Sequence, residues 1–303
     1  MHKFICISGC TASGKSSFAI ELADYFESPV IINADALQVY DCWKILTDRP
    51  TEKETIHNLY GHVSCNVHYS VGDWIKDVEN IFDLYSKNSK TFIFVGGTGL
   101  YFNALLNGLS QIPQIPEEIR DFANSCDLSF FLEGLNINDP GILAKIDTNN
   151  RRRVQRAWEV LEATGKSILY WQSKNTAPLI SVSNTTLFLV ELEKDGLANR
   201  ISTRVNHMLE CGVIKEVEQV YNTCWDKKLP FAKAIGAEDI VSYLNGEISF
   251  EKLFQNIALR TRQFAKRQRT WQRNYMKDWH SINTAGLNRL DIKKIVKKVK
   301  ANN

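Results

Sequence analysis

A glycine-rich segment close to the amino terminus has the composition and spacing of a phosphate-binding loop. Its sequence GCTASGKS, at 9–16, fits the pattern G-x-x-x-x-G-K-S and lies between an apolar run at 4–8 and a segment with helical spacing at 16–26. In such a loop the backbone N–H groups face an anion, the lysine supplies positive charge and the serine hydroxyl can hold Mg²⁺. We predict binding of a di- or triphosphate group, with Mg²⁺ as cofactor and Ser16 as its protein ligand. The residues expected to form the loop are Gly9, Cys10, Thr11, Ala12, Ser13, Gly14, Lys15 and Ser16.

The acid that would act beside this loop is Asp35. A nucleoside triphosphatase usually places an acidic residue after a second apolar strand, where it holds Mg²⁺ or water. The apolar run at 91–95 leads instead into the sequence GGTG at 96–99, which contains no acid. Asp35 follows the apolar run at 30–32, and ligands bind at the carboxyl ends of the strands in open α/β sheets. We therefore predict Asp35 at the ligand-binding edge; the alternative role for an aspartate here is a helix N-cap.

The elements that must position these residues follow from hydrophobic spacing along the chain. Short apolar runs alternate with segments of helical periodicity, which predicts an α/β fold with a parallel sheet covered on both faces. We expect a core domain formed by 1–110 and 186–303, and a mostly helical insertion domain at 111–185, where prolines separate helix-like segments. The expected strands are 4–8, 30–32, 91–95 and 186–191, and the expected helices are 16–26, 74–85, 119–123, 151–163, 201–221 and 250–275.

The composition is that of a globular protein with a full hydrophobic core. The chain has 303 residues, of which 44% are hydrophobic and 23% are charged, so disorder, collagen and coiled coil are excluded. No apolar stretch approaches the roughly 18 residues that a membrane helix needs. The seven cysteines, an odd number without a C-x-x-C pair, are expected to be free thiols in a reducing compartment. We therefore predict a cytoplasmic location.

Positive charge is concentrated in the last third of the chain. Residues 200–303 contain 20 Lys and Arg against 10 Asp and Glu, whereas residues 1–199 contain 17 against 24. The lysine-rich end at 293–303 is expected to serve mainly solubility. The helix expected at 250–275 has one packing face and one cationic face, and its charge density favours a nucleic-acid backbone as partner over plain solvation. Its cationic residues are Arg262, Lys266, Arg269 and Arg273, with Lys277 continuing the spacing just beyond 275, and a second group in the insertion comprises Arg151, Arg152, Arg153 and Arg156.

Seven blocks of sequence together resemble one family, the bacterial tRNA dimethylallyltransferases, also called tRNA isopentenyltransferases. The blocks occur in the family's order and cover nearly the whole chain, so they are far more specific than the phosphate-binding loop alone. The resemblance implies a P-loop NTPase-like core with a helical insertion. The blocks are TASGKS (11–16), NADALQVY (33–40), GGTGLYFNALLNGLS (96–110), RRVQRAWEVLEATGKS (152–167), RISTRVNHML (200–209), AIGAEDIVSYLNGEIS (234–249) and KRQRTWQR (266–273).

The resemblance also implies a reaction and residue roles. A dimethylallyl group would pass from dimethylallyl diphosphate to N6 of the adenine just 3′ of the anticodon, in tRNAs whose anticodon ends in adenine. The loop would hold the diphosphate of the prenyl donor and not ATP. Asp35 would be the base, Thr98 would contact the diphosphate near its bridging oxygen, and Arg204 would bind the diphosphate. The protein is expected to act as a monomer on the anticodon stem-loop. The residues implied to contact tRNA are Asp35, Ala36, Leu37, Gln38, Thr98, Arg120, Arg152, Arg153, Val154, Gln155, Arg156, Lys233, Gly236, Lys266, Arg267, Arg269 and Arg273.

Three other functions fit parts of this pattern. An adenylate isopentenyltransferase shares the core but acts on a free nucleotide and has little use for the basic helix. A small-molecule kinase would use the loop for ATP and Asp35 to activate a hydroxyl, whereas a non-catalytic RNA-binding module would leave the loop unexplained. The chain also departs from the family pattern, and two of the departures bear on contacts to the target adenine and its neighbours. The departures are Cys10, Ala36, Gly99 and Ala237, of which Ala36 and Ala237 are those two.

Overall fold

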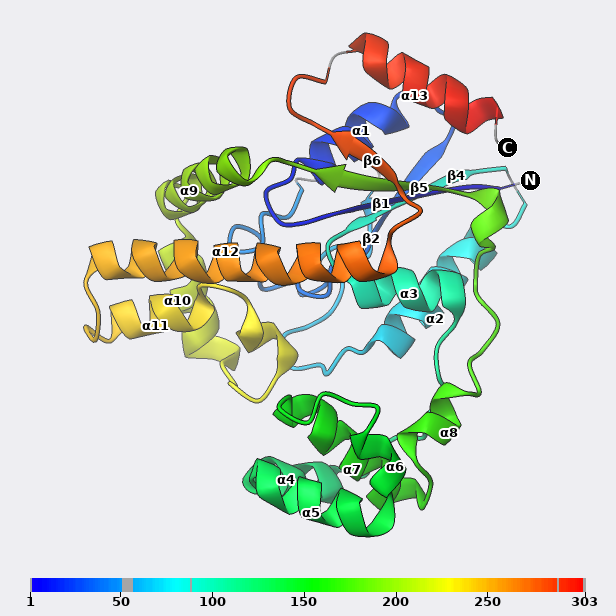
Figure 1. The fold of residues 1–303 in the computed structure, drawn as a ribbon. Coiled ribbons are helices and arrows are strands. Elements are labelled where there is room, and N and C mark those ends of the chain that lie inside the picture. The colour runs from blue at the N-terminus through cyan, green and yellow to red at the C-terminus, as the bar shows by residue number, and fades with distance from the viewer. Residues whose placement is uncertain (1, 51–56, 88, 288, 302–303) are drawn as a thin grey trace. The chain divides into compact units, whose positions relative to one another are not determined.

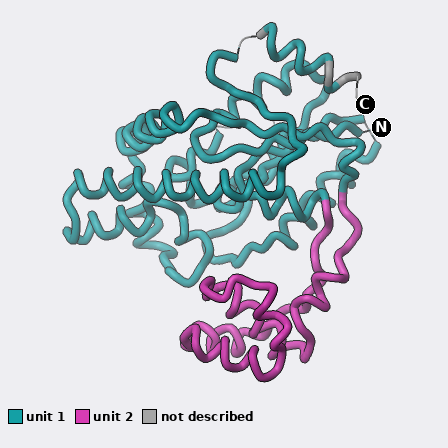
Figure 2. Tube along the Cα trace, viewed as in Figure 1, with its two compact units in different colours: residues 1–106, 180–303 teal, residues 107–179 magenta. Residues whose placement is uncertain are grey.

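The chain folds into two compact units (Figure 2). The first unit consists of Met1–Leu106 and Ile180–Asn303, and the second, Asn107–Leu179, is a single insertion in the first. No described helix is long and apolar enough to cross a membrane. A computed structural model describes residues 2–50, 57–87, 89–287 and 289–301.

The first unit is built on a six-stranded sheet in which all neighbouring strands are parallel (Figure 1). The strand order is β3-β2-β4-β1-β5-β6, which confirms the predicted α/β fold and the four expected strands. The edge strands β3 and β6 were not predicted, because both are short and neither contains a buried apolar run. The strands are β1 (Lys3–Gly9), β2 (Pro29–Asn33), β3 (His57–Asn58), β4 (Thr91–Gly96), β5 (Thr185–Glu191) and β6 (His280–Asn283).

Helices cover both faces of this sheet. Because side chains alternate along a strand, Ile5 and Ile7 of β1 face one side, where they pack in a core with Leu22. On the other side the ring of Phe82 lies 4.7 Å from that of Phe92 in β4. The sheet is therefore a buried middle layer, and its carboxyl edge is left to bind ligands. The covering helices are α1 (Lys15–Ala23) and α13 (Arg289–Ala301) on the first face, and α2 (Val71–Leu84), α3 (Gly99–Asn107) and α12 (Phe250–Tyr275) on the second.

The lysine-rich carboxyl-terminal segment is a folded part of the first unit. In α13 the side chains of Ile292, Val296 and Val299 are buried in the same core as α1. Apolar residues at steps of three and four form one packed face among the lysines, so this segment contributes to the core while its described lysines stay exposed.

Replacing Ile292 with alanine should lower the free energy of unfolding by about 2–5 kcal/mol, because the change leaves a cavity beside α1. Denaturant unfolding measures the loss. Lys293 is exposed on the same helix, so Lys293→Ala serves as the control and should change stability by less than about 0.5 kcal/mol. Equal stability of the two variants would contradict the packing of α13.

The helix expected at 201–221 is in fact two helices, α9 (Lys194–Glu210) and α10 (Val213–Cys224). Gly212 between them has a φ of +93°, a left-handed conformation that interrupts an α-helix and that glycine adopts without strain. The single-helix prediction is wrong because apolar spacing continues across this glycine. The chain then forms a 3₁₀ turn, η2 (Pro230–Lys233), and helix α11 (Ala237–Leu244) before it enters α12.

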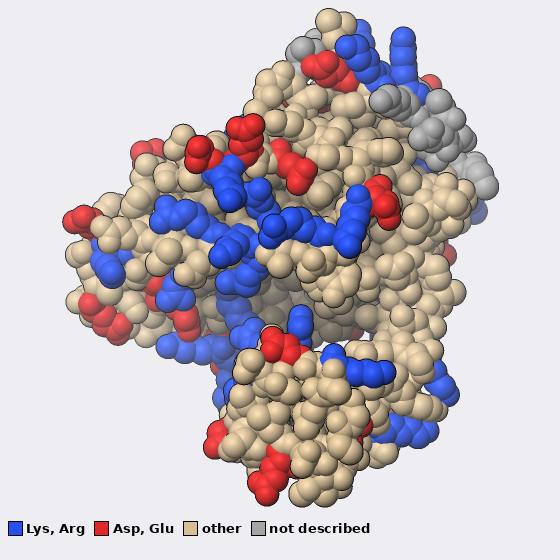
Figure 3. All heavy atoms as spheres, viewed as in Figure 1, with Lys and Arg blue, Asp and Glu red and all other residues tan. Residues whose placement is uncertain are grey.

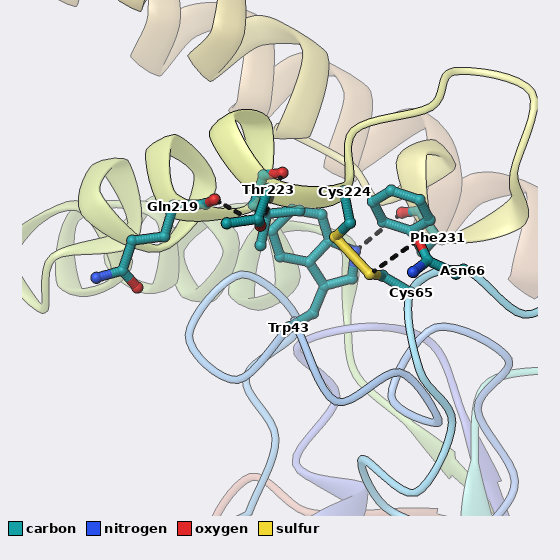
Figure 4. Close-up of a disulfide and its surroundings, with 8 residues drawn as sticks. Trp43, Cys65, Asn66, Gln219, Thr223, Cys224 and Phe231 are labelled. Atoms are coloured by element: carbon teal, nitrogen blue, oxygen red, sulfur yellow. Dashed lines mark hydrogen bonds between the residues drawn. A yellow bond between two sulfur atoms is a disulfide. The ribbon is translucent and has the colours of Figure 1, made fainter.

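Two cysteines that are 159 residues apart in the sequence are joined in a disulfide (Figure 4). Cys65 lies in the loop after β3, and Cys224 is the last residue of α10. Figure 4 shows the bond beside Trp43, whose indole N–H donates to the carbonyl oxygen of Phe231. The expectation of seven free thiols is wrong for this pair, because spacing alone does not show which cysteines folding brings together. The free cysteines are Cys6, Cys10, Cys42, Cys126 and Cys211.

The second unit is a helical domain with a core of its own. Its longest helix begins where the Asn150 side chain accepts a hydrogen bond from the N–H of Arg153, and ends at Gly165 in a left-handed conformation. The helices are α4 (Glu117–Ser125), α5 (Leu128–Asn138), α6 (Pro140–Leu143), α7 (Arg151–Thr164) and α8 (Ile168–Gln172). The core residues are Ala123, Phe131, Leu135, Ile142, Val154, Ala157 and Trp158.

Candidate active site

The phosphate-binding loop joins β1 to α1 at the carboxyl edge of the sheet. Ala12 and Gly14 have φ values of +61° and +88°, so the chain turns sharply within the loop. Gly14 is the residue before α1 and carries no capping side chain, so it leaves the first N–H groups of this helix for an anion. Arg200 and Thr284 brace the loop, since both donate to the carbonyl oxygen of Ser13, at 3.3 and 2.7 Å.

The side chain of Lys15 is half-buried beside the loop. Burial lowers the pKa of Lys15, because low-polarity surroundings disfavour the charged form, while the charge of Asp35 acts in the opposite direction. Its Nζ donates to the carbonyl oxygen of Cys10 at 3.5 Å. An ammonium group that has lost water gains more from an anionic ligand than an exposed one does.

Asp35 is held in place by the residues on both sides of it. Asn33 is the last residue of β2 and is fully buried. Its side chain accepts a hydrogen bond from the N–H of Asp35 at 2.9 Å and donates to the carbonyl oxygen of Asp35 at 3.0 Å. The carboxylate oxygen Oδ1 of Asp35 in turn accepts from the N–H of Leu37 at 3.0 Å. Backbone and side chain of Asp35 are thus both fixed before any substrate binds.

Thr98 lies directly beside the Asp35 segment. Its hydroxyl oxygen accepts from the N–H of Ala36 at 3.0 Å, and its own N–H donates to the carbonyl oxygen of Ala34 at 3.2 Å. A Cβ on Gly96 would collide with the backbone of Ala34, so only glycine permits this approach. A Cβ on Gly99 would likewise collide with the indole of Trp271, which gives a reason for glycine at this departure from the family pattern.

Arg204 closes the site from α9. Its Nη1 donates to the hydroxyl oxygen of Thr11 at 3.1 Å and lies 3.4 Å from Oδ2 of Asp48. The structure therefore brings Lys15, Asp35 and Arg204, which are far apart in the sequence, to one cleft of the first unit. The lining residues of this cleft are Thr11, Lys15, Asp35, Leu37, Gln38, Leu46, Thr47, Arg204, Val205, Met208, Ile235, Ile257, Thr261 and Phe264.

Gln268 on α12 connects the two loops of the site and was not predicted. Its Oε1 accepts from the N–H of Thr11 at 2.8 Å, and its Nε2 donates to the carbonyl oxygen of Gly97 at 3.0 Å. The side chain is only 7% exposed. The sequence did contain one indication of this role. Gln268 lies on the packing face of the helix, where a buried amide needs hydrogen-bond partners.

Gln268→Glu should destabilise the protein by about 1–3 kcal/mol, because the variant loses the donor to Gly97 and places a carboxylate oxygen against a carbonyl oxygen. Urea unfolding measures the change. Gln263 is exposed on the same helix, so Gln263→Glu is the matched control. If both variants unfold at the same urea concentration, Gln268 does not bridge the loops.

Residues 38–275 match the family model described as IPP transferase. The chain belongs to the IPP transferase family. The tRNA dimethylallyltransferase of Cereibacter sphaeroides is 43% identical to it over 285 residues, which cover 92% of this chain and 95% of that protein. The tRNA dimethylallyltransferase of a Ruegeria species is 42% identical over 281 residues, which cover 92% and 94%.

Solved structures of IPP transferases have the same fold. The full-length tRNA isopentenylpyrophosphate transferase of Bacillus halodurans has a TM-score of 0.71 at 28% identity, covering 100% of this chain and 97% of that one. A eukaryotic dimethylallyltransferase, described as acting on tRNA, has a TM-score of 0.81 at 26% identity, covering 99% of this chain and 78% of its own. These neighbours confirm the P-loop-like α/β fold.

A basic surface covers α12 in this IPP transferase. Figure 3 shows Lys and Arg side chains gathered along this helix. Arg269 is half-buried, while Lys266, Arg267 and Arg273 are exposed. A groove between α9 and α12 has cationic walls and an apolar floor. Its lining residues are Lys194, Leu197, Ala198, Ile201, Arg262, Lys266, Arg269 and Arg273.

Other residues implied to contact tRNA lie around the cleft of the first unit. Gln38 lines the cleft, and its Nε2 donates to the carbonyl oxygens of Thr47 and Asp48. Lys233 is exposed at the end of η2, while Gly236 is buried and has a φ of +95°. Gly236 has no side chain to present to a ligand, so its role is to allow this backbone conformation.

In the insertion, some of the residues implied to contact tRNA are exposed and others are buried. Arg152 and Arg153 are exposed, and Arg156 pairs with Glu159, with Nη1 3.7 Å from Oε2. Val154 is fully buried in the core of the insertion, so its side chain is not available to an RNA ligand. Gln155 is 8% exposed, and its Nε2 donates to Asn124 and Glu159. The side chains of Val154 and Gln155 both lie on the packed face of α7 and therefore present little surface to a ligand. Arg120 lies on α4, close enough for its charge to act on Arg156.

The residues of the loop fit a Mg²⁺ ion that is bound together with a diphosphate. Among the described residues, no group of three or more His, Cys, Asp and Glu side chains could hold a metal ion. Mg²⁺ commonly keeps several waters and is bound by few protein groups together with substrate phosphates. Ser16, in the first turn of α1, would supply one hydroxyl oxygen. The nearby Oγ of Ser13 is fully buried and has no hydrogen-bond partner among the described residues.

Proposed function

We propose that this protein transfers a dimethylallyl group from dimethylallyl diphosphate to N6 of the adenine 3′-adjacent to the anticodon of tRNA, and releases diphosphate. The observation that carries the proposal is one cleft lined by the carboxylate of Asp35 and the cations of Lys15 and Arg204. The acceptor needs a base and the leaving group needs positive charge, and the cleft contains both. Membership in the IPP transferase family and relatives named tRNA dimethylallyltransferase support the same reaction.

Asp35 acts on the acceptor. An exocyclic adenine amine is a poor nucleophile, because its lone pair is delocalised into the ring. Asp35 accepts a proton from N6 as the new C–N bond forms, which is general base catalysis. The N–H of Leu37 donates to the carboxylate and keeps it oriented, while the side chain of Asn33 holds the backbone of Asp35, so little reorganisation is needed in the transition state.

The loop acts on the leaving group. As the allylic C–O bond breaks, negative charge grows on the diphosphate, and Lys15, Arg204 and the loop N–H groups stabilise it. Thr98 contributes a hydrogen bond near the bridging oxygen, since its oxygen already accepts from Ala36 and its hydroxyl hydrogen can donate. Mg²⁺, when bound, supplies further positive charge to the departing diphosphate.

The anticodon stem-loop of tRNA is bound through its backbone by exposed and half-buried cationic side chains. The target adenine leaves the stacked loop, at a cost of about a few kcal/mol that the backbone contacts offset. The enzyme works as a monomer in the cytoplasm. The cations proposed for this surface are Lys233, Lys266, Arg267, Arg269 and Arg273 in the first unit and Arg120, Arg152, Arg153 and Arg156 in the insertion.

A comparison of acceptors tests this function. Labelled dimethylallyl diphosphate and Mg²⁺ are supplied with an unmodified anticodon stem-loop that has three consecutive adenines, or with AMP. Label is expected on the stem-loop alone, and none is expected when guanine replaces the adenine that follows the anticodon. Label on AMP at a comparable rate would instead identify a nucleotide prenyltransferase. Stem-loop binding without product would identify an RNA-binding module.

A further inference from the structure

Arg204 makes an ion pair that the proposed reaction does not require. Its Nη1 lies 3.4 Å from Oδ2 of Asp48 and also donates to the hydroxyl of Thr11. The Asp48 side chain is 65% exposed, against 24% for Arg204. A cation that is proposed to bind the diphosphate is thus shared with a carboxylate of the chain itself.

We propose that Asp48 sets the affinity of the cleft for diphosphate by competing with the diphosphate for Arg204. The inference rests on the proposed function, because it takes Arg204 as a ligand of the diphosphate. A diphosphate in the cleft must either draw the guanidinium away from Asp48 or bind close to a second negative charge. Both routes weaken binding, and the high exposure of Asp48 keeps the effect moderate.

The backbone of Asp48 is fixed, so its carboxylate remains within reach of Arg204. Its N–H donates to the carbonyl oxygen of Ile45 at 3.0 Å, and its carbonyl oxygen accepts from Nε2 of Gln38 at 3.2 Å. Its φ is +55°, a left-handed conformation that Asp and Asn adopt more readily than most residues. Asparagine can therefore replace Asp48 without backbone strain.

The loop that carries Asp48 is anchored from α10 as well. Both carboxylate oxygens of Glu216 accept hydrogen bonds from the consecutive N–H groups of Lys44, Ile45 and Leu46, each at 2.8 Å. Removing one charge at Asp48 leaves these three bonds intact. A change in diphosphate affinity would then report electrostatics at Arg204 and not a displaced loop.

The competition has a defined kinetic consequence. Without the Asp48 charge, both dimethylallyl diphosphate and the diphosphate product should bind more tightly. The KM for the prenyl donor should fall and product inhibition should increase, while the KM for the stem-loop stays unchanged. Asp48 therefore favours release of the diphosphate product at the expense of donor affinity.

Calorimetric titration with inorganic diphosphate and Mg²⁺ tests the inference. We expect Asp48→Asn to bind diphosphate about two- to fivefold more tightly than the wild type, the scale of one exposed ion pair. Asp41 is exposed on the same loop, so Asp41→Asn removes the same charge and should leave the affinity unchanged. In an Arg204→Gln background the gain from Asp48→Asn should shrink, because the two changes act on one contact.

The outcomes separate this inference from the proposed function. Equal or weaker diphosphate binding by Asp48→Asn, in a protein whose wild type binds diphosphate, would overturn the competition and leave the diphosphate site standing. A gain of the same size for Asp41→Asn would also overturn it, because the effect would then be one of general charge. Failure of the wild type to bind diphosphate would overturn both the inference and the proposed donor site.

Discussion

Asp35→Asn is expected to lower the rate of dimethylallyl transfer by about 10²- to 10⁴-fold, the range that a positioned general base contributes. Asparagine keeps a side-chain oxygen that can accept from the N–H of Leu37, so the local turn should survive. What it loses is the ability to take a proton from the adenine N6. Single-turnover transfer to the anticodon stem-loop, with both substrates saturating, measures the chemical step.

The Asp35 prediction requires that substrate binding is preserved. The affinities of Asp35→Asn for the stem-loop and for inorganic diphosphate should remain within a few-fold of the wild type, and its urea midpoint should be unchanged. A variant that binds both ligands and still transfers at the wild-type rate would remove Asp35 from the mechanism. The loop would then have to activate the donor without base assistance at the acceptor.

Lys15→Gln is expected to lower the transfer rate by about 10²- to 10³-fold, as is typical when one group that stabilises transition-state charge is removed. The glutamine side chain is one bond shorter than that of lysine and has no charge to offer the departing diphosphate. Since burial already lowers the pKa of Lys15, its ammonium is held in surroundings that favour an anionic partner. Steady-state kinetics with varied dimethylallyl diphosphate measure the effect.

Lys44 provides the matched control for Lys15. Lys44 is exposed on the segment between Asp35 and Asp48. Lys44→Gln therefore removes the same charge near the cleft but outside the phosphate-binding loop. This control should transfer at nearly the wild-type rate. Comparable losses in the two variants would indicate a long-range charge effect and would contradict a direct role of Lys15 at the diphosphate.

Much of the fold could be predicted because its signals are local. The phosphate-binding loop is a contiguous pattern, and β1, β2, β4 and β5 are apolar runs that a buried parallel strand requires. The edge strands were missed, since β6 is mostly exposed and carries no such run. Gly212 divides one predicted helix into two. Its left-handed conformation could not be predicted, because the apolar spacing continues across it.

The parts of the site that were missed are contacts between distant segments. Gln268 reaches the N–H of Thr11 across 257 residues of sequence, and no local pattern at either end specifies the partner. The ion pair of Arg204 with Asp48 and the disulfide at Cys65 have the same character. Sequence motifs identified the candidate reactive residues. The packing of α9 and α12 determines which of these residues come into contact.

The most direct test of the proposed reaction is its stoichiometry with dimethylallyl diphosphate and the anticodon stem-loop, followed in parallel with ATP in place of the prenyl donor. We expect one diphosphate to be released for each dimethylallyl group found on N6 of the adenine that follows the anticodon, and no ATP to be consumed. Consumption of ATP with no prenylated RNA would contradict the proposed reaction. The loop would then be a nucleotide site, and the roles assigned to Asp35, Thr98 and Arg204 would have to be abandoned.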